Sequence, residues 1–164
     1  MINTNKNLNL KGEISLITGA TRGIGNSIAE VFARAGSIVI GTATTQEGAE
    51  RITANLSDAG LKGHGIVLDI SQSEQISNQI KELKKSNLMP SILINNAGIV
   101  PRYSASDKVE GTTEGSWNQV MDVNVKGVFL GTKCAILLMR GVGGRSIVNI
   151  SSGAGIAPSP ETPA

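Results

Sequence analysis

The chain reads Thr18-Gly19-Ala20-Thr21-Arg22-Gly23-Ile24-Gly25 where a short apolar run gives way to residues of helical period. Glycines at such a turn permit a tight change of direction and let a pyrophosphate approach the backbone. They also leave the N–H groups at the helix start aimed at the anion. The alternative is an ordinary strand-to-helix turn, since turns are rich in glycine. The apolar strand before the turn and the amphipathic helix after it favour a dinucleotide-binding turn.

Short β-branched runs alternate with longer stretches of helical period along the rest of the chain. This alternation predicts βαβ units and a parallel sheet. The expected strands are Ile14 to Thr18, Ile38 to Thr42, Gly65 to Leu68, Ile92 to Asn95 and Ser146 to Ile150. They are mostly apolar throughout, which indicates helices on both faces of the sheet. We therefore expect a doubly wound α/β sheet of the Rossmann-like type, with strand order 3-2-1-4-5.

Two of the helices between these strands are expected to begin at capping residues. The second helix starts near Thr44, with Glu47 three residues on, and the third starts at Ser71, with Glu74 at the same spacing. A hydroxyl followed three residues later by a glutamate is typical of a capping box.

The first and fourth helices are predicted from their apolar residues. The first has an apolar stripe that begins at Ile24, and Gly36 offers its C-terminal stop. The fourth runs from about Ser116 to Met139 and is almost entirely apolar in its second half. It contains Cys134, the chain's single cysteine, which we expect in the core. One cysteine excludes a disulfide framework or a cysteine-based metal cluster within the chain.

Composition is that of a soluble globular protein, with 40% hydrophobic and 17% charged residues among 164. One dinucleotide-binding domain, residues 11–164, is expected after a polar tail, residues 1–10. The net charge of +2 is small and the basic residues are scattered, so no surface for nucleic acid is predicted. No signal peptide and no run of about 20 apolar residues is found, so we expect no membrane segment and a cytoplasmic location.

Five motifs in order resemble those of the short-chain dehydrogenase/reductase family. The first is the turn already quoted, with its Gly-x-x-x-Gly-x-Gly spacing, and the second is Asp69 after the third strand. Asn95-Asn96-Ala97-Gly98 ends the fourth strand, Asn124 stands in the fourth helix, and Ser151-Ser152 follows the fifth strand. Each of these alone has a plainer explanation as a turn, a cap or a loop hydroxyl. Together they cover nearly the whole chain.

The resemblance implies a role for each matching residue. Ser152 would hydrogen-bond the substrate oxygen, and Asn124 would hold a water in a proton relay. Asp69 would contact the adenine. The residues expected to contact the dinucleotide are Gly19, Thr21, Arg22, Gly23, Ile24, Gly25, Thr44, Asp69, Ile70, Asn96, Ala97 and Gly98. No metal is expected.

The family's catalytic Tyr, with a Lys four residues later, has no match in this chain. That Tyr would fall just past Ala164, and the chain's single tyrosine, Tyr103, has Asp107 in the place of the Lys. An unperturbed Tyr titrates near about 10, so it needs a neighbouring cation to act near neutrality. We therefore expect the last strands of the domain to be missing and these 164 residues alone to be inactive.

The preferred cofactor is predicted from the end of the second strand, Gly41 to Thr45, which has no acidic residue. An acid there would bind a ribose 2′-hydroxyl and repel a 2′-phosphate, whereas Thr hydroxyls and the Arg22 guanidinium can receive the phosphate. NADP(H) is therefore favoured over NAD(H). The alternative is that Arg22 is only a solvated turn residue.

The expected activity is the interconversion of a carbonyl and a secondary alcohol. Residues 1 to 99 resemble bacterial 3-oxoacyl-acyl-carrier-protein reductases of fatty acid biosynthesis, whereas Asn124 to Arg145 resembles secondary-alcohol or steroid dehydrogenases of the same family. The expected partner is therefore a small-molecule carbonyl or an acyl-carrier-protein thioester, and full-length relatives are homo-oligomers. A non-catalytic nucleotide-binding fragment is the alternative of another class.

Overall fold

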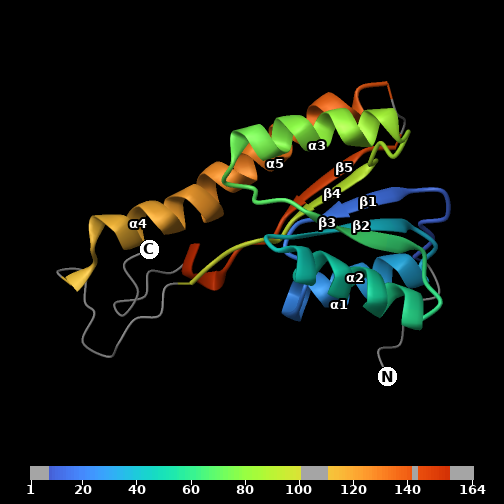
Figure 1. Ribbon diagram of the computed structural model, residues 1–164, viewed down its shortest axis with the longest axis horizontal. Helices are drawn as coiled ribbons and strands as arrows, with labels where there is room; N and C mark the ends of the chain where they lie inside the picture. The colour runs from blue at the N-terminus through green and yellow to red at the C-terminus, as the bar shows by residue number, and fades with distance from the viewer. Residues whose placement is uncertain (1–7, 101–110, 142–143, 156–164) are drawn as a thin grey trace.

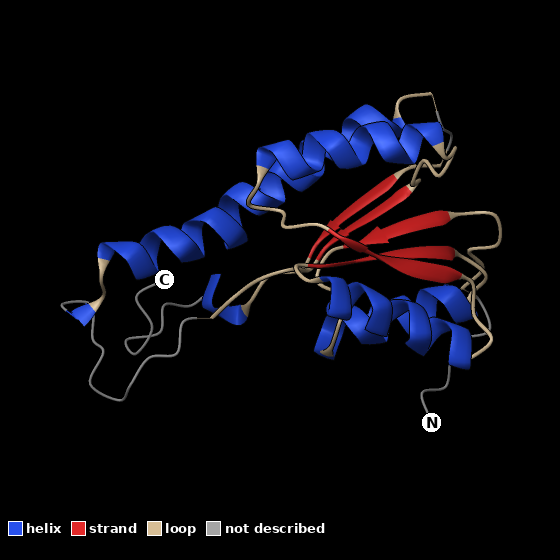
Figure 2. Cartoon of the chain, in the orientation of Figure 1, coloured by secondary structure: helices blue, strands red, loops and turns tan. Residues whose placement is uncertain are grey.

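Parallel strands form a single sheet in the computed structural model, which describes residues 8–100, 111–141 and 144–155. Figures 1 and 2 show the sheet at the centre of the molecule. Its strands are β1 (Ile14–Ile17), β2 (Ile38–Ala43), β3 (Gly63–Val67), β4 (Ile92–Asn95) and β5 (Ser146–Asn149). Their spatial order is β3-β2-β1-β4-β5, which confirms the predicted order 3-2-1-4-5.

Helices cover both faces of the sheet. Helices α1 (Gly23–Arg34) and α2 (Gln46–Asp58) lie on one face, and α3 (Ser73–Lys85) and α5 (Gly127–Met139) lie on the other (Figure 1). This arrangement is the predicted doubly wound, Rossmann-like fold. It explains why the inner strands are apolar throughout, because each residue faces one helical layer or the other.

The side chains of neighbouring residues in β1 point into the hydrophobic cores on opposite faces of the sheet, because successive side chains of a strand alternate between its two faces. Leu16 packs with Leu138 of α5 on one face, while Ile17 packs with Ile52 of α2 on the other. Each of these side chains is at most 2% exposed. Burying one such side chain contributes about 1.5–3 kcal/mol. The first strand is therefore the point where both hydrophobic cores meet.

The predicted helix starts were wrong in detail. Helix α2 is capped by Thr45, not Thr44, because the Thr45 Oγ1 atom accepts a hydrogen bond from the Gly48 N–H at 3.1 Å. Helix α3 begins at Ser73 and makes no side-chain cap hydrogen bond. The hydroxyl of Ser71, expected to cap it, donates instead to the carboxylate of Asp69 at 2.7 Å.

The apolar stripe of α1 also differs from the prediction. Ile24 was expected on the buried face, but its side chain is 63% exposed. The residues of this helix that are buried are Gly25, Ala29 and Ala33, which recur at every fourth position. Small residues let the helix axis approach the sheet closely, so the larger Ile24 is turned outward.

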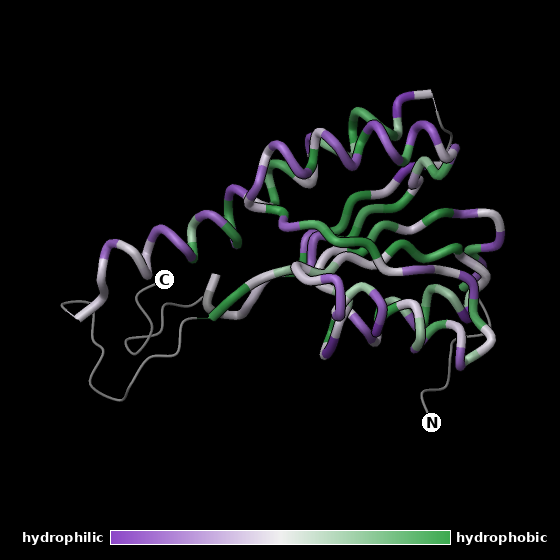
Figure 3. Tube along the Cα trace, in the orientation of Figure 1, coloured by the Kyte–Doolittle hydropathy of each residue, from purple (hydrophilic) through white to green (hydrophobic). Residues whose placement is uncertain are grey.

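The fourth predicted helix is found in three parts. It begins at α4 (Glu114–Met121), continues through a π-helical turn (Asp122–Lys126) and ends as α5. Its start precedes the expected Ser116, because Thr113 caps it by accepting a hydrogen bond from the Ser116 N–H at 3.1 Å. Figure 3 shows α4, of mixed hydropathy, reaching beyond the apolar strands of the sheet. Among the helices that the structure describes, none combines the length and the apolar character needed to span a bilayer.

Candidate functional site

A threonine joins the carboxyl ends of the two central strands. Thr18 follows β1, and its Oγ1 atom accepts hydrogen bonds from the backbone N–H groups of Asn96 and Ala97, both at 2.9 Å. The Asn96 side-chain amide donates in return to the carbonyl oxygens of Thr18 at 2.9 Å and Gly19 at 3.2 Å. The turn after β1 and the loop after β4 are therefore held together as one unit.

Two glycines make this close approach possible. Gly19 has φ +66°, in the left-handed region, and a Cβ added to it would lie 2.9 Å from the Ala97 Cα atom. A Cβ on Gly25 would collide with the carbonyl oxygen of Gly19. The spacing of these glycines is thus a requirement of packing between α1, its preceding turn and the β4 loop.

The start of α1 faces outward from this turn with donors available. Arg22 is the N-cap residue, and within the described chain its side chain makes no capping hydrogen bond. The first N–H groups of a helix have no partner within the helix, and the helix dipole adds partial positive charge there. The same turn is anchored to β2, because the Gly19 N–H donates to Thr42 Oγ1 at 3.1 Å. The arrangement is suited to holding an anion.

A cleft of about 620 Å³ lies over the carboxyl ends of the strands. Its volume is in the range of small-molecule and cofactor sites. Every residue predicted to contact the dinucleotide lines it: Gly19, Thr21, Arg22, Gly23, Ile24, Gly25, Thr44, Asp69, Ile70, Asn96, Ala97 and Gly98. The residues come from separate parts of the sequence, and the sheet order brings them together. Their contact with a dinucleotide remains a prediction.

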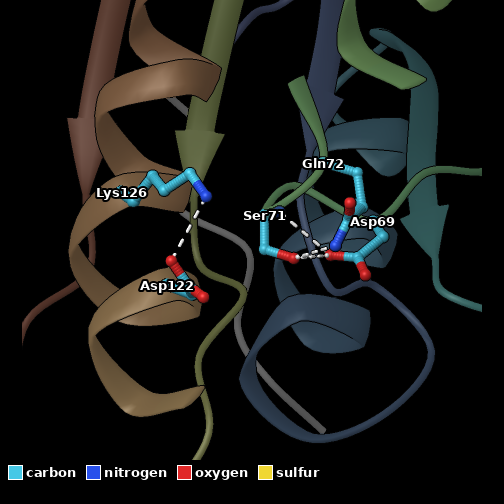
Figure 4. A network of polar contacts seen from close by, with 5 residues as sticks. All are labelled: Asp69, Ser71, Gln72, Asp122 and Lys126. Carbon is cyan, nitrogen blue, oxygen red and sulfur yellow. Dashed lines mark hydrogen bonds and ion pairs between the residues drawn. The ribbon is translucent and has the colours of Figure 1, made fainter. Parts of the chain in front are cut away.

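Asp69 is fixed at the rim of the cleft by a local turn, which Figure 4 shows beside the Lys126–Asp122 ion pair of the π-helical turn. Its Oδ1 atom accepts hydrogen bonds from the Ser71 N–H at 2.9 Å and the Ser71 hydroxyl at 2.7 Å. The Oδ2 atom makes no hydrogen bond to any residue that the structure describes. The carboxylate is therefore oriented with one oxygen able to accept a bond from a ligand.

Asn124 lies in the π-helical turn, and both the oxygen and the nitrogen of its side-chain amide form hydrogen bonds with the backbone of Ile99. Its Oδ1 atom accepts from the Ile99 N–H at 2.9 Å, and its Nδ2 group donates to the Ile99 carbonyl oxygen at 2.8 Å. This pair of bonds ties the helix to the loop after β4. The predicted role, holding a water in a proton relay, is not tested by this geometry.

Ser152 follows β5, as the sequence predicted, and is exposed. It does not line the cleft. The strand before it is held in place by Asn95, whose Nδ2 group donates to Asn149 Oδ1 at 2.8 Å and Thr132 Oγ1 at 3.1 Å. The predicted contact between the Ser152 hydroxyl and a substrate oxygen is not tested by this structure and stays a prediction. Tyr103 lies outside the described residues.

Thr42, in the stretch Gly41 to Thr45 already predicted to lie near the 2′-phosphate, lines the cleft and supplies the acceptor for Gly19. Two further polar residues of the lining, Gln119 and Arg51, were not indicated by the sequence. Arg51 lies one turn into α2 and contributes a second arginine side chain to the lining, besides Arg22. No motif marks Arg51, because its place depends on how α2 is rotated about its axis.

Cys134 is in the core, as predicted. Burial raises the pKa of its thiol from the ordinary 9.0 to about 11. The thiolate is the reactive form of cysteine, so this side chain is inert near neutrality.

The sheet order, the flanking helices and the glycine-lined cleft define a Rossmann-like domain. The chain belongs to the short chain dehydrogenase family, whose family model matches residues 13–164. This confirms the resemblance found in the sequence motifs.

Relatives of several activities are similar to the chain. It is 36% identical over 151 residues to the 3-oxoacyl-[acyl-carrier-protein] reductase FabG of Haemophilus influenzae, which covers 92% of this chain and 60% of the relative. It is 34% identical over 152 residues to the 3beta-hydroxysteroid dehydrogenase of Mediterraneibacter gnavus, which covers 93% of this chain and 54% of the relative. The chain thus spans less than two thirds of either relative's length.

Solved structures agree with the fold. A gluconate 5-dehydrogenase from Burkholderia cenocepacia, crystallised in complex with NADP and tartrate, superposes with a TM-score of 0.87 at 29% identity. The match covers 95% of this chain and 60% of that one.

Proposed function

We propose that this chain is the cofactor-binding part of an NADP(H)-dependent oxidoreductase that interconverts a carbonyl and a secondary alcohol. The observation that carries the proposal is the cleft over the strand ends. There the Gly19–Gly25 turn, the β4 loop and the start of α1, which has no side-chain cap hydrogen bond, come together. A pyrophosphate suits this place because the glycines let the turn pack closely against the β4 loop and because the N–H donors at the start of α1 are available to an anion.

The preference for NADP(H) rests on the charge of the cleft beside β2. The lining there is formed by Ala43, Thr44 and Thr45, none of which is acidic, and Arg22 at the start of α1 lines the same cleft. Hydroxyl and guanidinium groups accommodate a 2′-phosphate, and the absence of an acid among these lining residues removes the group that would repel it. The NADP bound in the Burkholderia cenocepacia enzyme is consistent with this choice.

In the proposed reaction the bound dinucleotide supplies the hydride to the carbonyl carbon. Ser152 would donate a hydrogen bond to the substrate oxygen, which becomes an alkoxide and must take up a proton. Asn124 would position the loop after β4, and with it the neighbouring wall of the cleft, through its two bonds to Ile99. The proton would come from a general acid, such as the family's Tyr with its Lys neighbour.

The substrate we favour is a 3-oxoacyl thioester carried by an acyl carrier protein, because the FabG reductases are among the relatives that match the chain over most of its length. A secondary alcohol of steroid type is the second candidate, and the Mediterraneibacter gnavus relative favours it.

Binding and turnover are tested separately. Calorimetric titration of the 164-residue chain with NADPH should give saturable one-site binding. Turnover is assayed with 3-oxoacyl thioesters and a panel of steroid ketones, for this chain and for a chimera continued with the matching C-terminal part of the Haemophilus influenzae relative. We expect the chimera alone to oxidise NADPH. Absence of dinucleotide binding would refute the proposal, and equal turnover by both proteins would refute the need for the added segment.

A further inference from the structure

Helix α2 begins against the cleft. Its cap residue Thr45 and its first-turn residue Gly48 both line the cleft, and a Cβ on Gly48 would lie 3.1 Å from the Thr21 methyl carbon and 2.8 Å from the Ala43 Cβ. The helix is thereby held close to the turn before α1. Arg51 follows Gly48 by three residues, a spacing that places both on one face of the helix. The side chain of Arg51 therefore joins the lining of the cleft.

The part of the cleft next to α2 is basic. Arg22 and Arg51 line it, and among the described residues of the lining the only acid is Asp69, whose Oδ1 atom already accepts two hydrogen bonds from Ser71. The three acids of α2, Glu47, Glu50 and Asp58, do not line it. The Glu50 Oε1 atom accepts a hydrogen bond from the Gln46 side-chain amide at 2.9 Å.

In the part of the chain that the structure describes, no carboxylate pairs with the guanidinium of Arg51 and competes with a ligand anion. Within residues 8–100, 111–141 and 144–155 it makes no ion pair. Arg34, on α1, shows the contrast, because its guanidinium is paired with Glu30 at 2.7 Å and lies outside the cleft. An arginine without a carboxylate partner at the wall of a cofactor cleft is free to pair with a phosphate, which its planar fork binds through two parallel hydrogen bonds.

We infer that Arg51 is a second specificity residue for the dinucleotide, whose guanidinium binds the 2′-phosphate together with Arg22. The inference rests on the proposed function and adds to it a residue outside the glycine-rich turn. A phosphate monoester carries close to two negative charges at neutral pH and three acceptor oxygens. Two guanidinium groups, one from the start of α1 and one from α2, match that charge. Thr44 and Thr45 add hydroxyls to the same lining.

The test uses two fragments of the cofactor that differ only in this phosphate, adenosine 2′,5′-bisphosphate and 5′-AMP. Their affinities are measured by calorimetric titration for the 164-residue chain and for Arg51→Ala, Arg51→Lys and the control Arg34→Ala. We expect Arg51→Ala to weaken the bisphosphate about tenfold, the effect of losing a charge-assisted hydrogen bond, and to change 5′-AMP less than about twofold. Arg51→Lys should retain part of the preference, because it keeps the charge without the fork. Arg34→Ala should change neither ligand.

The possible results distinguish a failure of the Arg51 inference from a failure of the proposed function. Equal losses of both ligands in Arg51→Ala, or no loss of either, would overturn the role of Arg51 while leaving dinucleotide binding intact. A wild-type chain that binds neither fragment nor NADPH would overturn the proposed function and this inference with it. Thermal melting of each variant checks folding, and if Arg51→Ala melts early, the bisphosphate-to-AMP ratio of Arg51→Lys decides the matter.

Discussion

Replacing Thr18 by Val tests the junction between β1 and the β4 loop. Valine has nearly the shape of threonine but no hydroxyl, so the N–H groups of Asn96 and Ala97 both lose the acceptor that stands 2.9 Å away. Thr18 is 1% exposed, so water cannot take the place of its hydroxyl without a local rearrangement. An unsatisfied buried donor costs about 1–3 kcal/mol. Because both amides are only half-buried, we expect a total loss near the lower end, about 2–3 kcal/mol.

The control is Thr18→Ser, which keeps the hydroxyl and removes one methyl group at a cost of about 1 kcal/mol. Free energies of unfolding are measured for both variants by urea denaturation. We also expect Thr18→Val to bind NADPH more weakly than Thr18→Ser under conditions where both are folded, since the affected loop lines the cleft. A Val variant as stable as the Ser variant would show that the hydroxyl does not hold the junction.

Three further predictions concern the cleft and the core. Arg22→Ala should weaken NADPH about tenfold and NADH much less, by calorimetric titration, and equal losses would reject the assignment of Arg22 to the 2′-phosphate. Asn124→Asp should destabilise the chain by about 1–3 kcal/mol in urea, because the Ile99 carbonyl loses its donor and faces a carboxylate, and no change would mean that the bond from Nδ2 to this carbonyl does not stabilise the fold. For Cys134, the unfolded thiol ionises above about 9 while the folded one stays protonated to about 11, so the free energy of unfolding should fall as pH rises between these values. Cys134→Ala should show a shallower fall over the same pH window, and an identical slope would argue against the raised pKa of the thiol.

The topology was predictable because its determinants are local. Each inner strand is an apolar run bounded by turn residues, and the turn at Gly19 to Gly25 identifies the first βα unit, so the order of the strands follows from the rules of parallel sheets. Helix starts were less predictable. Thr44 and Thr45 both offer a hydroxyl, and it is Thr45, with an extended backbone of φ −129° and ψ 155°, whose hydroxyl serves as the cap.

The site was predictable to the extent that it is built from the glycine-rich turn and the strand ends. The exposure of Ile24 was missed because apolar spacing does not reveal that the small residues Gly25, Ala29 and Ala33 face the sheet. Arg51 was missed for a related reason, since the rotation of α2 about its axis is set by contacts of Gly48 with distant residues.

The π-helical turn at Asp122–Lys126 constrains how the length of this protein can change. An α-helix advances by about 100° per residue, and the turn holds one residue more than a regular helix would need for the same rise. Deleting a residue there would give a straight α-helix of the same rise, so α4 and α5 could keep their places while the residues inside the turn would change their orientation. The amide of Asn124 would then turn away from Ile99 and lose both hydrogen bonds, whereas Asp122 and Lys126 would stay on one face at a spacing of three residues. We therefore expect the loss of one residue in the turn to preserve the helix and to break its connection to the loop after β4.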